Sequence, residues 1–175
     1  MRFTDDFFYV TTSRDAAAEF VTRLHNGLPK YGCLANTDKT RVSFSLTLPD
    51  GKQAKRCEEH SINWCGLTFH TSTMEVLPDY SRYYGSFMSH TITTGATMNP
   101  GELFRRKMIQ HLKPKCHLLL LDLRLNSLST VHESLFRILI FAAVKFHCYC
   151  RALPQKPANN PDFFMGTLPP PAHWH

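Results

Sequence analysis

The sequence has no stretch of about 18 consecutive apolar residues, the length that a membrane-spanning helix needs, so we expect no membrane segment. Its first residues place Asp5 and Asp6 where a secretory signal would carry its apolar stretch. We therefore expect no signal peptide and an intracellular protein, in which the six cysteines are thiols.

Paired Cys-x-x-Cys spacing, which is typical of structural zinc modules, is also absent. Cysteine and histidine nevertheless gather in three short groups, which leave a zinc site open as an alternative: Cys57, His60 and Cys65; Cys116 and His117; His147, Cys148 and Cys150. Buried thiols and ordinary histidines explain these residues better.

Acidic residues are scarce in the second half of the chain. Residues 1–80 contain 9 Lys and Arg against 10 Asp and Glu, a net charge of −1, whereas residues 81–175 contain 11 against 4, a net charge of +7. This asymmetry indicates a polyanionic partner for the second half. The 175 residues, 43% of them apolar, suffice for one domain or for two small halves that share a core.

The first half shows mainly the patterns of β-strands. Residues 1–12 predict a hairpin with the two aspartates in its turn, and Ser13 is a candidate N-cap for a helix over 14–26. Further predictions follow along the chain: a strand or loop edge over 31–35, a turn over 36–39, a strand over 40–48 with Val42, Phe44, Leu46 and Leu48 inward, a turn over 49–52, a polar loop to residue 60, and a hairpin whose arms are 62–69 and 73–77.

The second half shows mainly helical patterns. We expect a helix capped by Asp79, a Ser/Thr/Gly-rich loop over 89–101, a basic helix over 102–112 that Pro114 stops, and a disordered proline-rich tail over 169–175. The longest helix is predicted over 127–153, with one buried apolar stripe made of Leu128, Val131, Leu135, Ile138, Leu139, Ala142 and Phe146. Strands followed by helices predict an α+β fold with a mainly helical second half.

Asp5 and Asp6 are adjacent and lie between apolar segments. Aspartate is common in turns, so the pair could serve the turn alone. Two neighbouring carboxylates repel each other unless a cation lies between them, and a hard divalent ion such as Mg²⁺ prefers oxygen ligands of this kind. The pair is therefore a candidate for two-metal phosphoryl transfer.

The segment Phe3 to Phe7 resembles motif C of reverse transcriptases. Residues 30–40 resemble motif D, and residues 63–67 resemble motif E in its telomerase form. Four later segments resemble the C-terminal extension of telomerase reverse transcriptase: 115–117, 121–123, 126–128 and 146–147. The similarity covers roughly residues 1–168, and its ordered motifs favour telomerase over the alternative of a retroelement reverse transcriptase.

The resemblance implies an RNA-directed DNA polymerase that extends telomeric DNA 3′ ends in the nucleus, at chromosome telomeres. Residues 1–77 would be part of the palm, with antiparallel hairpins and a helix, and residues 78–168 part of a helical thumb. The implied partners are telomerase RNA, the telomeric DNA primer and deoxynucleoside triphosphates. The implied site residues are Asp5 and Asp6 as Mg²⁺ ligands, Lys39 as general acid, Trp64, Cys65, Gly66 and Leu67 as primer grip, and Arg105, Arg106 and Lys107 as contacts to the RNA–DNA hybrid.

Motif A, which supplies a further catalytic acid in that family, does not occur in the sequence, and neither do motif B, the fingers or the RNA-binding domain. We therefore expect a C-terminal fragment that is inactive alone. A non-catalytic fragment that binds nucleic acid or the parent enzyme's partners stays open as an alternative. No Lys or Arg occurs between Arg82 and Arg105, so contacts from the thumb loop to DNA are not expected.

Overall fold

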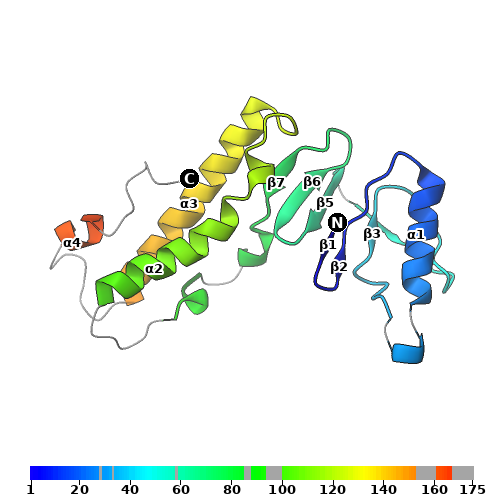
Figure 1. Cartoon of the computed structure of the whole chain (residues 1–175), viewed down its shortest axis with the longest axis horizontal. Coiled ribbons are helices and arrows are strands. Elements are labelled where there is room, and N and C mark those ends of the chain that lie inside the picture. The colour runs from blue at the N-terminus through cyan, green and yellow to red at the C-terminus, as the bar shows by residue number, and fades with distance from the viewer. Residues whose placement is uncertain are drawn as a thin grey trace. The chain divides into compact units, whose positions relative to one another are not determined.

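Short strands and one helix make up the first part of the chain and helices make up the second, so the predicted α+β class is confirmed (Figure 1). The computed structural model describes residues 1–27, 29–32, 34–57, 59–84, 88–93, 100–152 and 161–166. The chain forms two units, Met1–Val76 and Leu77–His175. Among the described helices, none is both long and apolar enough to cross a membrane.

The predicted N-terminal hairpin is present, with its turn one residue earlier than expected. Strands β1 (Arg2–Phe3) and β2 (Asp6–Phe7) are antiparallel, with Phe3 paired to Asp6. The turn is therefore Thr4–Asp5, and Thr4 adopts φ 55°. Backbone hydrogen bonds between residues 1 and 8 extend the pairing, which fixes this register.

Helix α1 (Arg14–Asn26) has the predicted bounds and caps. The Ser13 hydroxyl accepts a hydrogen bond from the Ala16 N–H at 3.2 Å and so satisfies one free donor of the first turn. Gly27 ends the helix with φ 59°, a value that glycine adopts without a Cβ penalty. Phe20 stacks on Tyr9 with ring centroids 4.5 Å apart, which attaches the helix to the chain leaving the hairpin.

The strand predicted over 40–48 is regular only in β3 (Arg41–Val42). The predicted burial is nevertheless correct, because Val42 and Leu48 are buried, Phe44 and Leu46 are half-buried, and the residues between them are exposed. The polar loop predicted up to residue 60 is wrong at β4 (Lys55–Arg56), which pairs parallel with β3. Val42, Leu48 and Ala54 form the small core here.

The second predicted hairpin was assigned the wrong arms. Strands β5 (Ser61–Trp64) and β6 (Leu67–His70) form a hairpin by themselves, and β7 (Val76–Pro78) adds a third strand to the sheet. The turn residues Cys65 and Gly66 both have positive φ, 50° and 80°, as in a type I′ turn. Cysteine is not a usual residue of such turns, so the sequence did not predict this one. The segment predicted as a strand or loop edge instead begins in a 3₁₀ turn, η1 (Pro29–Tyr31).

The helix predicted after Asp79 is only a 3₁₀ turn, η2 (Ser81–Tyr83), although the Asp79 carboxylate does accept a hydrogen bond from the Ser81 N–H. The other helical elements are η3 (Met88–Thr91), α2 (Pro100–Leu112), η4 (Lys113–Lys115), η5 (Leu118–Leu120), α3 (Leu128–Ala152) and α4 (Pro161–Gly166). The predicted tail over 169–175 and residues 94–99 of the predicted loop lie outside the described residues.

Helix α3 is present as predicted, but its predicted stripe is only partly correct: Val131 and Ile138 are buried and Ala142 and Phe146 are half-buried, whereas three leucines are not. Leu128, Leu135 and Leu139 are 59%, 41% and 65% exposed. The buried positions are Val131, Ser134, Ile138, Phe141, Lys145, Tyr149 and Cys150. The helix carries apolar residues on more than one side, so periodicity alone did not identify the side that packs on α2. Phe104 and Met108 of α2 form the core with Tyr149 and Cys150.

Candidate functional site

The acid pair lies at the tip of the first hairpin. Asp5 is in the turn, Asp6 is the first residue of β2, and both are exposed. Neither forms an ion pair with a residue that the structure describes, so their oxygens are available to a hard cation such as Mg²⁺. No group of three or more His, Cys, Asp or Glu able to hold a metal ion occurs in the described residues. The hairpin thus offers two carboxylate ligands.

The turn of the β5–β6 hairpin meets this acid pair. The Cys65 thiol donates a hydrogen bond to the Asp6 carboxylate, with 3.8 Å between Sγ and Oδ2. Partial burial raises the pKa of the Cys65 thiol, and the charges of Asp6 and Asp5 raise it further. The thiol therefore stays protonated at neutral pH, and its S–H continues to donate the hydrogen bond to the Asp6 carboxylate.

Residues from the three segments that resemble motifs C, D and E line one broad cleft in the first unit, with a volume of about 1150 Å³. Its lining includes Asp5, Asp6, Lys39, Trp64 and Cys65. Lys39 is exposed and ends a turn in which its N–H donates to the Asn36 carbonyl at 3.3 Å. Gly66 and Leu67 do not line the cleft.

Sequence reasoning missed several residues of this cleft. Three arginines, Arg2, Arg14 and Arg41, line it together with Asn63. None of the three arginines lies in a segment that we assigned to a motif, whereas Asn63 begins the segment 63–67. Arg14 reaches the cleft because the first turn of α1 is folded against residues 44–45: its guanidinium donates to the Ser45 carbonyl at 2.9 Å.

Trp64 is part of an aromatic cluster. Its ring stacks on Phe8 with centroids 5.6 Å apart, and Phe8 contacts Phe69 at 4.3 Å. The cluster attaches the acid hairpin to the β5–β6 sheet, so Trp64 has a structural role whatever it binds. The indole Nε1 is buried and has no hydrogen-bond partner among the described residues.

In the second unit, the three predicted phosphate contacts of α2 differ in their surroundings. Arg105 and Arg106 are exposed and form no ion pair with any described residue. Lys107 is half-buried, and its ammonium donates to the backbone carbonyl and to the hydroxyl of Thr93. Two of the three cations therefore point to solvent without an internal acceptor.

A second group of cations packs against aromatic rings, and sequence reasoning missed it. Lys145 is 1% exposed, donates to the Thr91 hydroxyl and lies 5.9 Å from the Phe141 ring. Lys115 lies 5.6 Å from the rings of both Phe141 and Tyr80. Burial lowers the pKa of both lysines and raises the pKa of Tyr80 to about 12. The i, i+4 spacing of Phe141, Lys145 and Tyr149 could have predicted a buried face of α3. The lysine at its centre made that prediction unattractive, because lysine side chains are usually exposed.

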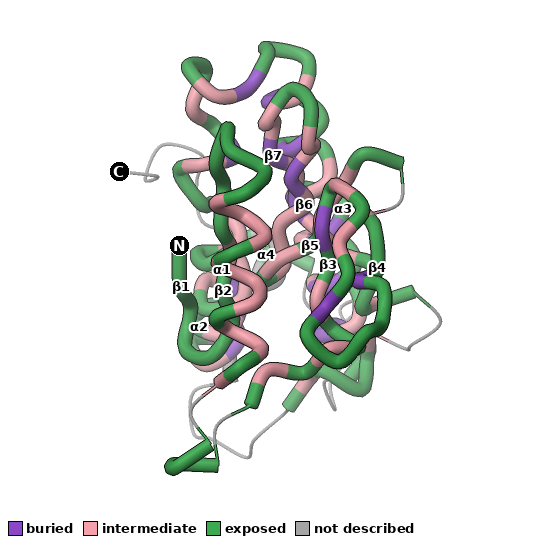
Figure 2. Tube along the Cα trace, turned by 90° about the vertical axis from the view of Figure 1, so that its right-hand side faces the viewer, coloured by how far each residue is buried: buried purple, intermediate pink, exposed green. Residues whose placement is uncertain are grey.

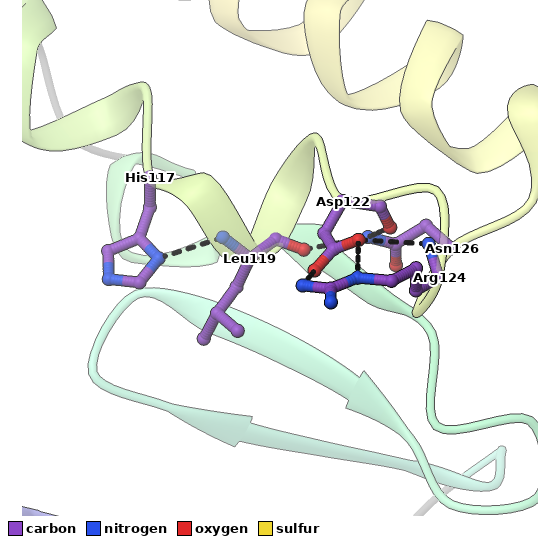
Figure 3. A network of polar contacts seen from close by, with 5 residues as sticks. All are labelled: His117, Leu119, Asp122, Arg124 and Asn126. Atoms are coloured by element: carbon purple, nitrogen blue, oxygen red, sulfur yellow. Dashed lines mark hydrogen bonds and ion pairs between the residues drawn. The ribbon is translucent and has the colours of Figure 1, made fainter.

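The segment before α3, which carried part of the family resemblance, forms a hydrogen-bonded turn (Figure 3). The Asp122 carboxylate accepts hydrogen bonds from the backbone and the guanidinium of Arg124, at 2.9 to 3.1 Å. The amide of the buried Asn126 donates to the Leu119 carbonyl at 2.7 Å, and the His117 ring accepts from the Leu119 N–H. These hydrogen bonds stabilise the turn, so the presence of His117, Asp122 and Asn126 at these positions has a structural reason and does not require a ligand.

Comparison with known proteins agrees with the motifs. A family model described as "Telomerase reverse transcriptase, C-terminal extension" matches residues 102–170. The telomerase reverse transcriptase of Mus musculus is 37% identical over 174 residues, which cover 96% of this chain and 15% of the relative. That of Oryzias latipes is 34% identical over 99% of this chain and 16% of the relative.

A plant relative extends the same pattern. The telomerase reverse transcriptase of Arabidopsis thaliana is 35% identical over 159 residues, or 85% of this chain and 14% of the relative. The chain thus spans about 15% of the length of the curated relatives that it matches. Together with the ordered motifs, these similarities show that the chain belongs to the telomerase reverse transcriptase family.

Proposed function

We propose that this chain supplies the late palm, residues 1–77, and part of the thumb, residues 78–168, of a telomerase catalytic subunit. The parent enzyme is an RNA-directed DNA polymerase that extends telomeric DNA 3′ ends. The observation that carries this proposal is the cleft of the first unit, which is lined by Asp5 and Asp6, by Lys39, and by Trp64 and Cys65. These three groups are far apart in the sequence and belong to motifs C, D and E.

Asp5 and Asp6 would hold Mg²⁺ with their carboxylate oxygens. When bound, such ions activate the attacking oxygen and stabilise the leaving one in nucleotidyl transfer. The hydrogen bond from Cys65 fixes one oxygen of Asp6, so the other oxygen and the Asp5 carboxylate stay available to the ion. A further ligand has to come from outside the described residues.

Lys39 is the cation of the cleft that we assign to the leaving group. Its ammonium group can stabilise the negative charge that develops on pyrophosphate, and its N–H groups can donate hydrogen bonds to it. No described residue forms an ion pair with it, and its exposure leaves it free to reach a bound phosphate.

The turn that joins β5 and β6 is suited to hold the primer 3′ end beside the acid pair. Gly66, with φ 80° and no side chain, lets a primer strand approach the backbone closely, and Trp64 is fixed by its stacking on Phe8. Alignment of this kind provides a large part of polymerase catalysis. Leu67, the partner of Trp64 in the ladder, supports the turn from within the hairpin.

The partners that follow from this proposal are telomerase RNA, a telomeric DNA primer and deoxynucleoside triphosphates, at telomeres in the nucleus. Arg105 and Arg106 of α2 are positioned on the surface for phosphates of the RNA–DNA hybrid, and Lys107 would add a weaker contact. The telomerase names of the relatives favour this reading over a retroelement reverse transcriptase. For the chain taken alone, the two-carboxylate site favours binding of nucleic acid without synthesis.

The test is Asp5→Ala in a full-length telomerase reverse transcriptase that carries residues 1–175 of this sequence. We expect primer extension to be abolished and binding of telomerase RNA to be unchanged, because the substitution removes a metal ligand and leaves the RNA-binding parts intact. Asp15→Ala, which removes an exposed carboxylate of α1 outside the cleft, is the matched control and should extend primers normally.

Undiminished extension by the Asp5→Ala enzyme would show that Asp5 is no metal ligand. The same assay on the purified 175-residue chain should show no incorporation of labelled nucleotide. Incorporation by the chain alone would contradict the proposal that its metal site needs a ligand from elsewhere.

A further inference from the structure

The paired strands β3 and β4 carry three exposed cations, which we call the basic ribbon: Arg41 and Lys55, which lie opposite each other, and Arg56, which follows Lys55 along β4. The strands are parallel, with Arg41 opposite Lys55 and Val42 opposite Arg56. All three cationic residues are exposed, and the two strands run next to each other on the face of the first unit seen in Figure 2.

This arrangement is unfavourable in the absence of an anion. Like charges directly opposite each other on neighbouring strands destabilise the pairing. No described carboxylate forms an ion pair with any member of the ribbon, whereas the nearby Lys52 is paired with Asp50 at 3.8 Å. The Arg41 Nη1 donates to the Asp38 carbonyl at 2.8 Å, which holds the guanidinium in place without neutralising it.

Buried residues anchor the backbone that carries the ribbon. Val42 of β3 and Ala54, which precedes β4, are each only 6% exposed and belong to one core cluster with Leu48. The backbone of both strands is thereby anchored, so the three charges are presented from a defined surface. A pre-positioned group of cations loses less conformational entropy when it binds an anion.

The ribbon is also continuous with the candidate active site. Arg41 lines the same cleft as Lys39 and the acid pair, while Lys55 and Arg56 lie outside that cleft. A nucleotide confined to the cleft would therefore leave Lys55 and Arg56 without a phosphate. A nucleic-acid strand, with one phosphate per residue, can contact Lys39 and Arg41 in the cleft and continue along the ribbon.

We propose that the basic ribbon binds the phosphodiester backbone of a nucleic-acid strand that enters or leaves the cleft. The choice of partner rests on the proposed function, but the ribbon is a surface of the first unit and is separate from the thumb contacts of α2. Contacts of this kind are independent of sequence and sensitive to salt. The sequence did not predict this surface, because the net charge over residues 1–80 is −1 and the cations come together only through the pairing of residues 41 and 55.

The experiment measures binding of the purified 175-residue chain to fluorescein-labelled 20-nucleotide single strands of RNA and of DNA, by anisotropy, between 0.05 and 0.3 M KCl. The variant is Arg41→Gln/Lys55→Gln/Arg56→Gln. If each cation contacts one phosphate, the slope of log Kd against log salt should decrease by about 2, and Kd at 0.1 M salt should rise by at least about tenfold. The RNA and DNA arms identify which strand uses the ribbon.

The matched control is Arg23→Gln/Lys30→Gln/Lys52→Gln, which removes three exposed cations of the same unit that do not belong to the ribbon. We expect its Kd to change less than threefold. A charge-retaining variant, Arg41→Lys/Lys55→Arg/Arg56→Lys, should bind like the original chain, which separates loss of charge from loss of folding. Far-UV circular dichroism of each variant checks the fold directly.

Equal weakening by the ribbon variant and the control would assign the effect to net charge and overturn the proposal. Unchanged affinity of the ribbon variant, together with weaker binding by Arg105→Gln/Arg106→Gln, would also overturn the proposal. That result would assign nucleic-acid binding to α2 instead. Failure of the polymerase proposal has a different signature, since it appears in primer extension by Asp5→Ala and not in these binding curves.

Discussion

We expect the surroundings of His111 to make the second unit less stable in acid. Its Nε2 shares a hydrogen bond with the hydroxyl of Tyr149 at 3.0 Å, which joins α2 to α3. Burial lowers the pKa of His111, and the charges of Lys145, Lys107 and Lys115 lower it further. The folded chain therefore binds a proton at this site less tightly than the unfolded chain does.

The sign of the resulting pH dependence follows from linkage. Between the lowered folded pKa and the unfolded value of about 6.5, the unfolded state holds more protons, so the free energy of unfolding decreases as the pH falls below about 6.5. We expect His111→Gln, which can still hydrogen-bond to Tyr149, to lose less thermal stability than the original chain between pH 7 and pH 5. Thermal unfolding at a series of pH values measures this difference.

His132, an exposed histidine of α3, provides the control. His132→Gln should follow the pH profile of the original chain. If His111→Gln also kept that profile, His111 would not be the residue that makes the unit acid-sensitive.

Single residues were predictable where a local rule determines them. Ser13 was identified as an N-cap because its hydroxyl directly precedes the apolar pattern of α1, and the cap is present. Asp5, Asp6 and Lys39 were found through motif resemblance, and the structure puts them on one cleft while their roles stay predictions. Lys145 was missed, because sequence rules treat lysine as exposed and its burial depends on Thr91 and Phe141.

Helix α3 presents one apolar face to the core and a second one to solvent. Ile138 is 5% exposed, while its neighbour Leu139 is 65% exposed, and Phe136 and Ile140 are exposed as well. A helix with apolar residues on several sides does not reveal its buried face by periodicity. Packing against α2 determines which face of α3 is buried: the Phe104 ring of α2 lies 5.5 Å from the ring of Phe146 and 5.7 Å from that of Tyr149.

Two alanine substitutions test which face of α3 is buried. We expect Ile138→Ala to lower the free energy of unfolding by about 2–4 kcal/mol, through lost burial and the cavity left behind. Leu139→Ala should change it by no more than about 0.5 kcal/mol, because the side chain is already in water. Urea unfolding of the 175-residue chain measures both, and a similar large loss at both positions would support the stripe predicted from the sequence, which includes both residues.

Elements with a strong local signal were predicted with nearly correct bounds, and those that depend on distant pairing were not. Helix α1 has both caps in the sequence, and the first hairpin has a polar turn between aromatic residues. By contrast, β4 is two residues long and pairs in parallel with β3, so it produces no periodic pattern. The β5–β6 hairpin was misassigned because its turn contains Cys65.

The distribution of charge over the whole molecule separates two kinds of surface. The first unit holds the acid pair and the basic ribbon, and the second unit holds most of the excess positive charge. On α2, Arg105 and Arg106 carry that charge at the surface, while Lys107 is engaged with Thr93. We therefore expect the two arginines to provide most of the binding to an RNA–DNA hybrid.

Salt dependence distinguishes these contributions. Arg105→Ala/Arg106→Ala should decrease the slope of log Kd against log salt for an RNA–DNA hybrid by up to about 1.8, whereas Lys107→Ala should change it little. Anisotropy titrations with a labelled hybrid at several salt concentrations measure the slopes. Slopes that stay the same in the double variant would mean that these arginines form only a solvated face.

The contact between Cys65 and Asp6 has a consequence for the chemical durability of the molecule. Thiolates, and not thiols, are the forms that oxidants and alkylating reagents attack. Partial burial, and after it the charges of Asp6 and Asp5, raise the pKa of the Cys65 thiol and so favour its unreactive protonated form. The same negative charge that suits the hairpin for a cation thereby protects the adjoining turn from oxidative damage.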